Sequence, residues 1–121
     1  MGRRGGMPAG VARGEVRLYR FTSADKTRPV LVLTRASALA YLSNVTVAPV
    51  TSTIRGAPSE VVLDVEDGMK TRCAVNLHNI VTVPRARLGK RVTQLGISKL
   101  RDVCVALRFS LGCDGSQAPP A

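Results

Sequence analysis

Two β-branched runs set the architecture of this chain: Thr27-Arg28-Pro29-Val30-Leu31-Val32-Leu33-Thr34 and Asn44-Val45-Thr46-Val47-Ala48-Pro49-Val50-Thr51-Ser52-Thr53. Each run has the length of a strand, is rich in Val and is bounded by Pro, Asn or Ser, which favours a strand over a helix. Arg28 stands at the start of the first run, and a Thr-Ser-Thr cluster ends the second. In an antiparallel pair, the start of one strand lies beside the end of the other. The pattern therefore predicts a corner of the sheet where a guanidinium meets two or three hydroxyls, and this corner is the candidate site.

The remaining sequence predicts a mainly β domain. Further short strands are expected at residues 15–21, 60–65, 73–77 and 80–83, one helical turn within residues 35–43, and a basic strand or loop at residues 85–92. In the first of these strands, Val16 and Leu18 alternate with Arg17 and Tyr19, which predicts a half-buried strand with Tyr19 on the polar face.

The chain is expected to end in a helix that packs on this sheet. Ser98 is its predicted N-cap, and Gly112 suits the position just after its last turn. The spacing of one helical face is shared by Leu100, Val103, Cys104, Leu107 and Leu111. About five to seven short strands followed by one helix indicate a small barrel-like sheet with the helix packed on it.

Composition divides the chain into one domain and two flanking segments. Residues 1–13 are rich in Gly and Arg without periodicity, and we expect a disordered basic arm there, a folded domain over residues 14–112, and a disordered tail over residues 113–121. The amino-terminal residues lack the apolar core of a secretion signal. No apolar run approaches the ~20 residues that span a bilayer, so a soluble protein without a membrane partner is expected.

Cysteine usage indicates a reducing compartment. The three cysteines, Cys73, Cys104 and Cys113, cannot all pair within the chain and have no metal-binding spacing, which fits the cytoplasm. Cys73 and Cys104 are expected to be small buried apolar residues. With one His, no Cys pair and no Gly-rich phosphate loop, no motif supports a metal or another cofactor.

The net charge points to a polyanionic partner. The chain has 18 Lys and Arg residues against 8 Asp and Glu residues, a formal charge of +10. Such an excess fits a nucleic acid or an acidic protein segment, and charge alone does not separate the two.

The order of several motifs resembles the MazF/PemK family of toxin endoribonucleases. These motifs are Gly14-Glu15-Val16, residues 28–33, Ala48-Pro49-Val50-Thr51-Ser52, residues 75–83, Arg87-Leu88-Gly89 and the terminal helix, and together they span residues 14–112. The amino-acid sequence of residues 44–56 is most similar to that of actinobacterial members. The resemblance implies an SH3-like barrel that forms homodimers, acts as the toxin of a type II toxin–antitoxin system and is inhibited by a small, acidic antitoxin.

The resemblance also implies a reaction and its residues. The family cleaves single-stranded RNA without a metal: the 2′-hydroxyl attacks the neighbouring phosphorus and leaves a 2′,3′-cyclic phosphate and a 5′-hydroxyl. Arg28 and Thr51 match the catalytic pair, and Ser52 is the alternative if the register slips by one residue. The planar, always-charged guanidinium of Arg28 suits stabilisation of an anionic phosphorane.

His78 departs from the family pattern, because many relatives have Asp at this position. An imidazole titrates near neutral pH and could act as general acid or base. The alternative is a structural role in a loop.

RNA binding is expected to use basic and polar side chains around the corner. The candidates are Arg35, Thr53, Arg55, Arg72, Asn76, Arg87, Lys90 and Arg91. Two other functions stay open. One is a gyrase-poisoning toxin, which shares this barrel but not the Arg28–Thr51 pair. The other is an RNA-binding module without catalysis.

Overall fold

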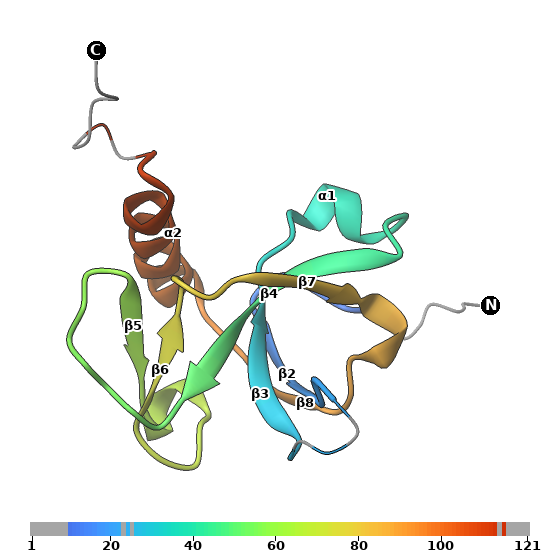
Figure 1. Ribbon diagram of the computed structural model, residues 1–121, viewed down its shortest axis with the longest axis horizontal. Coiled ribbons are helices and arrows are strands. Elements are labelled where there is room, and N and C mark those ends of the chain that lie inside the picture. Colours follow the sequence, from blue (N-terminus) through green and yellow to red (C-terminus); the bar gives the residue numbers. More distant parts are fainter. Residues whose placement is uncertain (1–9, 23, 25, 114, 116–121) are drawn as a thin grey trace.

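A computed structural model describes residues 10–22, 24, 26–113 and 115 and contains a curled, seven-stranded antiparallel sheet followed by a helix (Figure 1). The strands are β2 (Glu15–Tyr19), β3 (Arg28–Val32), β4 (Asn44–Thr51), β5 (Glu60–Leu63), β6 (Cys73–Asn76), β7 (Val81–Pro84) and β8 (Arg91–Gln94). The helices are α1 (Ala36–Leu39) and α2 (Ile97–Leu111), with the 3₁₀ turns η1 (Val65–Asp67) and η2 (Arg85–Arg87). The predicted fold class is confirmed.

Strand β4 is the centre of the sheet. The strand order is β5-β6-β4-β3-β2-β8, and β7 also pairs with β4. Along one edge of β4, its first half pairs with β7 up to Val47↔Val81, and its end pairs with β6 from Val50↔Val75. Pro49, which has no N–H to donate, stands where β4 changes partner. This change of partner divides the sheet into two parts that curl around each other.

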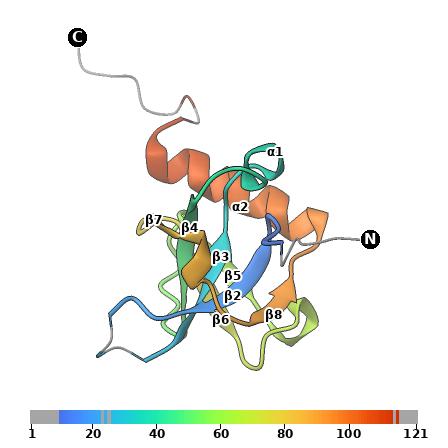
Figure 2. The same cartoon turned by 90° about the vertical axis from the view of Figure 1, so that its right-hand side faces the viewer.

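Both faces of the curled sheet are covered, so the core has two clusters. The first lies under α2 and includes Leu31, Val50 and Val103. The second lies on the opposite face of β3 and includes Val30 and Val32, together with the buried Leu39 of α1 and Leu88 after η2. Figure 2 shows α2 crossing behind the strands from its start near β8. Burial on both faces explains why the runs are apolar at consecutive positions instead of alternating.

The predicted exposure of Tyr19 is wrong, because this side chain is only 4% exposed. The prediction from alternating residues assumes that one face of the sheet is exposed to solvent. Here the curl places Tyr19 in the second cluster, while Leu18 is half-buried.

The predicted N-cap of the final helix is also wrong. Gly96 is the N-cap, and Ser98 already lies in the first turn. The helix starts early because Leu95 is buried and its N–H donates to the Gly14 carbonyl, after which the chain is free to turn. At the other end Gly112 caps the helix with φ of 71°, as predicted.

The folded contacts begin before residue 14. Val11 packs against the second cluster, and Arg13 donates to the Leu33 carbonyl and to Cys104 Sγ, 3.2 Å away. The rest of the predicted arm, residues 1–9, lies outside the described residues, as does most of the predicted tail. Within the described part of the chain, neither α-helix has the length and apolarity needed to cross a membrane.

Candidate active site

Arg28, at the start of β3, is the centre of a row of residues across three strands. Its cross-strand partner in β2 is Tyr19. The register between β3 and β4 runs Val32↔Val47, Leu31↔Ala48 and Val30↔Pro49, and its continuation by two residues places Arg28 opposite Thr51. Residues directly opposite in an antiparallel pair project from the same face. The observed pairing of β3 with β4 ends at Val30↔Pro49, and the last two residues of β4 pair with β6. A shared face for the Arg28 guanidinium and the Thr51 hydroxyl is therefore an extrapolation of this register by two residues.

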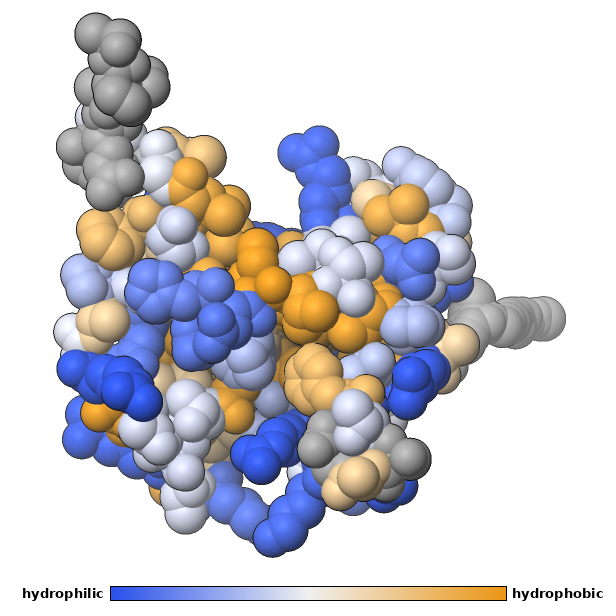
Figure 3. All heavy atoms as spheres, viewed as in Figure 1, coloured by the Kyte–Doolittle hydropathy of each residue, from blue (hydrophilic) through white to orange (hydrophobic). Residues whose placement is uncertain are grey.

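The corner is open to solvent. Arg28 is exposed and Thr51, the last residue of β4, is half-buried. The Thr51 hydroxyl accepts a hydrogen bond of 3.1 Å from the Thr53 N–H, which holds the chain in a turn directly after the strand. Figure 1 shows the start of β3 and the end of β4 at the lower end of the sheet, and Figure 3 shows mostly hydrophilic residues there.

The electrostatics of the corner are cationic. In the part of the chain that the structure describes, the ion pairs are Arg17–Glu15 at 3.0 Å, Arg91–Glu15 at 3.5 Å and Lys99–Asp67 at 3.7 Å. None of the three involves Arg28. Its guanidinium is therefore available to an anionic ligand.

Ser52 and Thr53 follow the end of β4 in a bend and are exposed. Ser52 lies one residue beyond Thr51 and is therefore out of register with Arg28. The backbone then enters a turn held by Glu60, whose Oε1 accepts N–H groups from Arg55, Gly56 and Ala57. Arg55 is exposed on this turn.

His78 and Asn76 occupy the turn between β6 and β7. The Asn76 side chain accepts the His78 N–H at 3.0 Å, and His78 is exposed. Thr51 pairs with Ala74, so Asn76 lies two residues past this pair, ~7 Å along the strand. His78 follows in the turn after the end of β6 and is outside the residues that pair with β4.

The basic candidates lie in separate places. Arg72 precedes β6 on the corner side of Ala74, whereas Arg55 lies on the turn held by Glu60, which pairs with Asn76 at the other end of β6. Residues 87–91 lie beside β2, since the Gly89 N–H donates to Leu18 O at 2.7 Å and the Leu18 N–H to Lys90 O at 3.0 Å.

Arg35 is the exception among these candidates. It follows β3 and lies seven residues from Arg28, at the opposite end of the strand, ~23 Å away if fully extended. The expectation that it borders the corner is not met by this placement.

The sequence predicted neither the burial of Tyr19 nor its contacts. Its ring lies 4.8 Å from the Phe21 ring in an edge-on arrangement, and the Arg87 guanidinium lies over it, 5.6 Å from its centroid. The sequence signal that could have pointed to Tyr19 was an aromatic residue in a strand expected to lie beside β3. Its contact with Arg87, 68 residues later, had no signal in the sequence.

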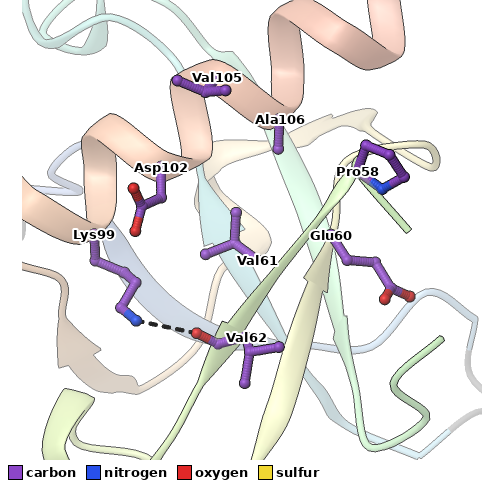
Figure 4. Close-up of a pocket in the computed structure, with 8 residues that line it drawn as sticks. All are labelled: Pro58, Glu60, Val61, Val62, Lys99, Asp102, Val105 and Ala106. Atoms are coloured by element: carbon purple, nitrogen blue, oxygen red, sulfur yellow. Dashed lines mark hydrogen bonds between the residues drawn. The ribbon is translucent and has the colours of Figure 1, made fainter. Parts of the chain in front are cut away.

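A separate groove lies between β5 and α2 (Figure 4). It has a volume of about 420 Å³, and its charged lining residues are Glu60, Lys99 and Asp102. Lys99 Nζ donates to Val62 O at 3.2 Å and covers part of the free edge of β5. None of the predicted catalytic residues lines this groove. In the described ranges, no three His, Cys, Asp or Glu side chains are grouped as metal ligands would be.

The fold and the corner define a small barrel-like β protein with an open, cationic site at strand ends. Residues 12–111 match the model of the PemK-like, MazF-like toxins of type II toxin–antitoxin systems. The chain belongs to this family, as the sequence motifs predict.

Individual relatives agree with this assignment. The chain is 41% identical over 108 residues to the probable endoribonuclease MazF5 of Mycobacterium tuberculosis, covering 88% of this chain and 98% of that protein. Among solved structures it is similar to the Mycobacterium tuberculosis toxin MazF-mt6, with 34% identity, a TM-score of 0.75 and coverage of 83% and 98% of the two chains. An endoribonuclease in complex with its cognate antitoxin, from a mycobacterial species, shares the fold with a TM-score of 0.77 at 22% identity, over 90% and 99% of the chains.

Proposed function

We propose that this toxin is an endoribonuclease that cleaves single-stranded RNA without a metal ion. The observation that carries the proposal is the antiparallel pairing of β3 with β4, whose register, continued two residues past Val30↔Pro49, sets the exposed Arg28 opposite Thr51. The endoribonuclease names of its relatives support the same activity. RNA supplies its own nucleophile, since the 2′-hydroxyl is adjacent to the phosphate that is cut.

In the proposed reaction, the 2′-oxygen forms a bond to phosphorus and the bond to the 5′-oxygen breaks. The proton of the 2′-hydroxyl passes to a base, and the departing 5′-oxygen receives a proton, so the products are a 2′,3′-cyclic phosphate and a 5′-hydroxyl. Arg28 donates parallel N–H bonds to the phosphorane oxygens, on which negative charge grows. The Thr51 hydroxyl orients the same phosphate, with Ser52 next to it after the strand end.

We assign binding of the RNA strand to the cationic and polar side chains expected around the corner. These are Thr53, Arg55, Arg72, Asn76, Arg87, Lys90 and Arg91. Such contacts release counterions, so affinity should fall steeply with salt.

We further propose that the toxin is a homodimer. An apolar patch, defined here as Ile80, Val81, Leu107 and Leu111, lies where the end of α2 meets the turn before β7. The Ser110 hydroxyl donates to Leu77 O at 3.0 Å and holds these segments together. Figure 3 shows hydrophobic residues gathered between α2 and β7. Leu111 is 57% and Val81 37% exposed, and β7 has a free edge, so a second copy would cover both.

The proposed inhibitor is an antitoxin with an acidic segment. The mycobacterial protein of the same fold forms a complex with its cognate antitoxin, and the charge of +10 favours rapid capture of an acidic chain. The three cysteines are free, with Cys73 buried and Cys104 half-buried, which fits the proposed cytoplasmic location.

Incubation of the purified protein with long single-stranded RNA in excess EDTA tests the proposal. Defined fragments with cyclic phosphate ends are expected. Growth arrest with intact RNA would instead indicate a gyrase-poisoning toxin, and a gel shift without cutting an RNA-binding module.

A further inference from the structure

The stacked pair formed by Arg87 and Tyr19 is an arrangement that the reaction above does not use. The Arg87 guanidinium carbon lies 5.6 Å from the centroid of the Tyr19 ring. A guanidinium over an aromatic face is attracted by the ring quadrupole. Arg87 is exposed, whereas Tyr19 is 4% exposed and fixed by the core and by the edge-on ring of Phe21. A rigid residue therefore holds a long, otherwise flexible side chain.

The pair stands directly beside the proposed catalytic arginine. Tyr19 is the cross-strand partner of Arg28, and their side chains project from the same face. Arg87 approaches this face from η2, which is anchored by Leu88 in the core and by a hydrogen bond from Arg85 to Leu39 O. Two guanidinium groups are thus presented on one surface, with one aromatic ring between their attachment points.

The charge of Arg87 is not neutralised within the described residues. Its one hydrogen bond there is long, 3.4 Å from Nη2 to Arg20 O, and it forms none of the ion pairs of that part of the chain. The other N–H donors of its planar guanidinium are therefore free to bind phosphate oxygens. The neighbouring basic residue Arg91, by contrast, is already paired with Glu15.

We propose that Tyr19 is a positioning residue that holds Arg87 for a second phosphate of the RNA strand whose scissile phosphate binds Arg28. This inference rests on the proposed function. Arg87 aligns the strand by a contact made equally in the ground state and the transition state. Its loss should therefore raise KM and leave kcat unchanged. Loss of Arg28 should lower kcat.

The salt dependence of binding tests the inference without any cleavage. The probe is a single-stranded RNA of mixed sequence with 2′-O-methyl groups, which lacks the nucleophile. Each phosphate contact contributes about 0.7 to the slope of log K against log salt for a single strand. Arg87→Ala is expected to reduce the slope by about 0.7. Arg101→Ala, which removes the same charge from the exposed face of α2, is the matched control and should keep the wild-type slope.

Tyr19 variants separate positioning from packing. Tyr19→Leu should reproduce the reduced slope, and Tyr19→Phe, which keeps the ring, should restore it. The double variant Tyr19→Leu/Arg87→Ala should bind no more weakly than Arg87→Ala, because Tyr19 acts through Arg87. A wild-type slope in Arg87→Ala, or additive losses in the double variant, would overturn the inference. Intact RNA after incubation with wild-type protein would contradict the proposed nuclease activity. The salt-dependence slopes of binding would still test the role of the Tyr19–Arg87 pair.

Discussion

Arg28, the first residue of β3, stands opposite Thr51, the last residue of β4, when the register of the two strands is continued past Val30↔Pro49. The two residues are 23 positions apart in the chain, and the ends of two antiparallel strands bring them to one corner. Solvent reaches both residues, since Arg28 is exposed and Thr51 is half-buried. In the proposed reaction, Arg28 stabilises the negative charge on the phosphorane and the Thr51 hydroxyl orients the phosphate.

Removal of the corner's charge should abolish most of the activity without unfolding the protein. We expect Arg28→Ala to slow RNA cleavage by about 10²–10³-fold, the usual loss for a donor that stabilises a developing anion. Thr51→Ala should slow it as well. Because Arg28 is exposed, the midpoint of thermal unfolding should stay unchanged. Initial rates on a defined RNA measure the effect, with Arg101→Ala as control. Wild-type rates in both corner variants would contradict the assignment.

His78 is expected to act as a turn residue. Its N–H donates to the Asn76 side chain, and it lies in the turn after β6, outside the strand residues that pair with β4. His78→Ala should therefore keep both the cleavage rate and the acid limb of the pH–rate profile. A loss of about 10²–10⁴-fold together with disappearance of that limb would instead show general acid–base catalysis by the imidazole.

The buried Cys73 thiol should make stability fall in alkaline solution. Burial, helped by the nearby carboxylates Asp64 and Asp67, raises the pKa of this thiol above its ordinary value of 9.0. Well below pH 9.0 the thiol is protonated in both the folded and the unfolded chain. As the pH rises through 9.0 the unfolded chain loses the proton first, so the free energy of unfolding decreases until the folded thiol also ionises.

Denaturant titrations on either side of pH 9.0 can measure this decrease in the free energy of unfolding. Other groups titrate in the same range, so the informative quantity is the difference between the wild type and Cys73→Ala. The variant should lose less stability with rising pH. Cys113→Ala is the control, because Cys113 is exposed. Equal slopes for wild type and Cys73→Ala would contradict the prediction.

The apolar patch should control assembly. Val81→Lys or Leu111→Lys would place a charge in the proposed interface, and each should convert a dimer into a monomer while the barrel stays folded. Sedimentation velocity distinguishes the two states. Ile97→Lys is the control, since Ile97 is 72% exposed at the other end of α2. A wild-type chain that sediments as a monomer at micromolar concentration would refute the proposed dimer.

Local patterns predicted the elements well where they depend on neighbours in the chain. The run from Val30 to Val32 forms a strand, and Gly112 ends the helix in the left-handed conformation that glycine adopts most easily. The failures at Tyr19 and Ser98 have one origin. Both residues were assigned from their neighbours in the chain, whereas the curl of the sheet buries Tyr19 and the anchoring of Leu95 starts the helix ahead of Ser98.

The sequence by itself determined the succession of short strands along the chain, the terminal helix, the excess of positive charge and the family, because these follow from composition, periodicity and the order of motifs. Only the tertiary structure decided which side chains share a surface. It paired Tyr19 with Arg28, placed the Arg87 guanidinium over the Tyr19 ring, and set Arg35 beyond the far end of β3. The physical reason is that cross-strand register and curvature arise from packing between segments far apart in the chain, and no local pattern encodes that packing.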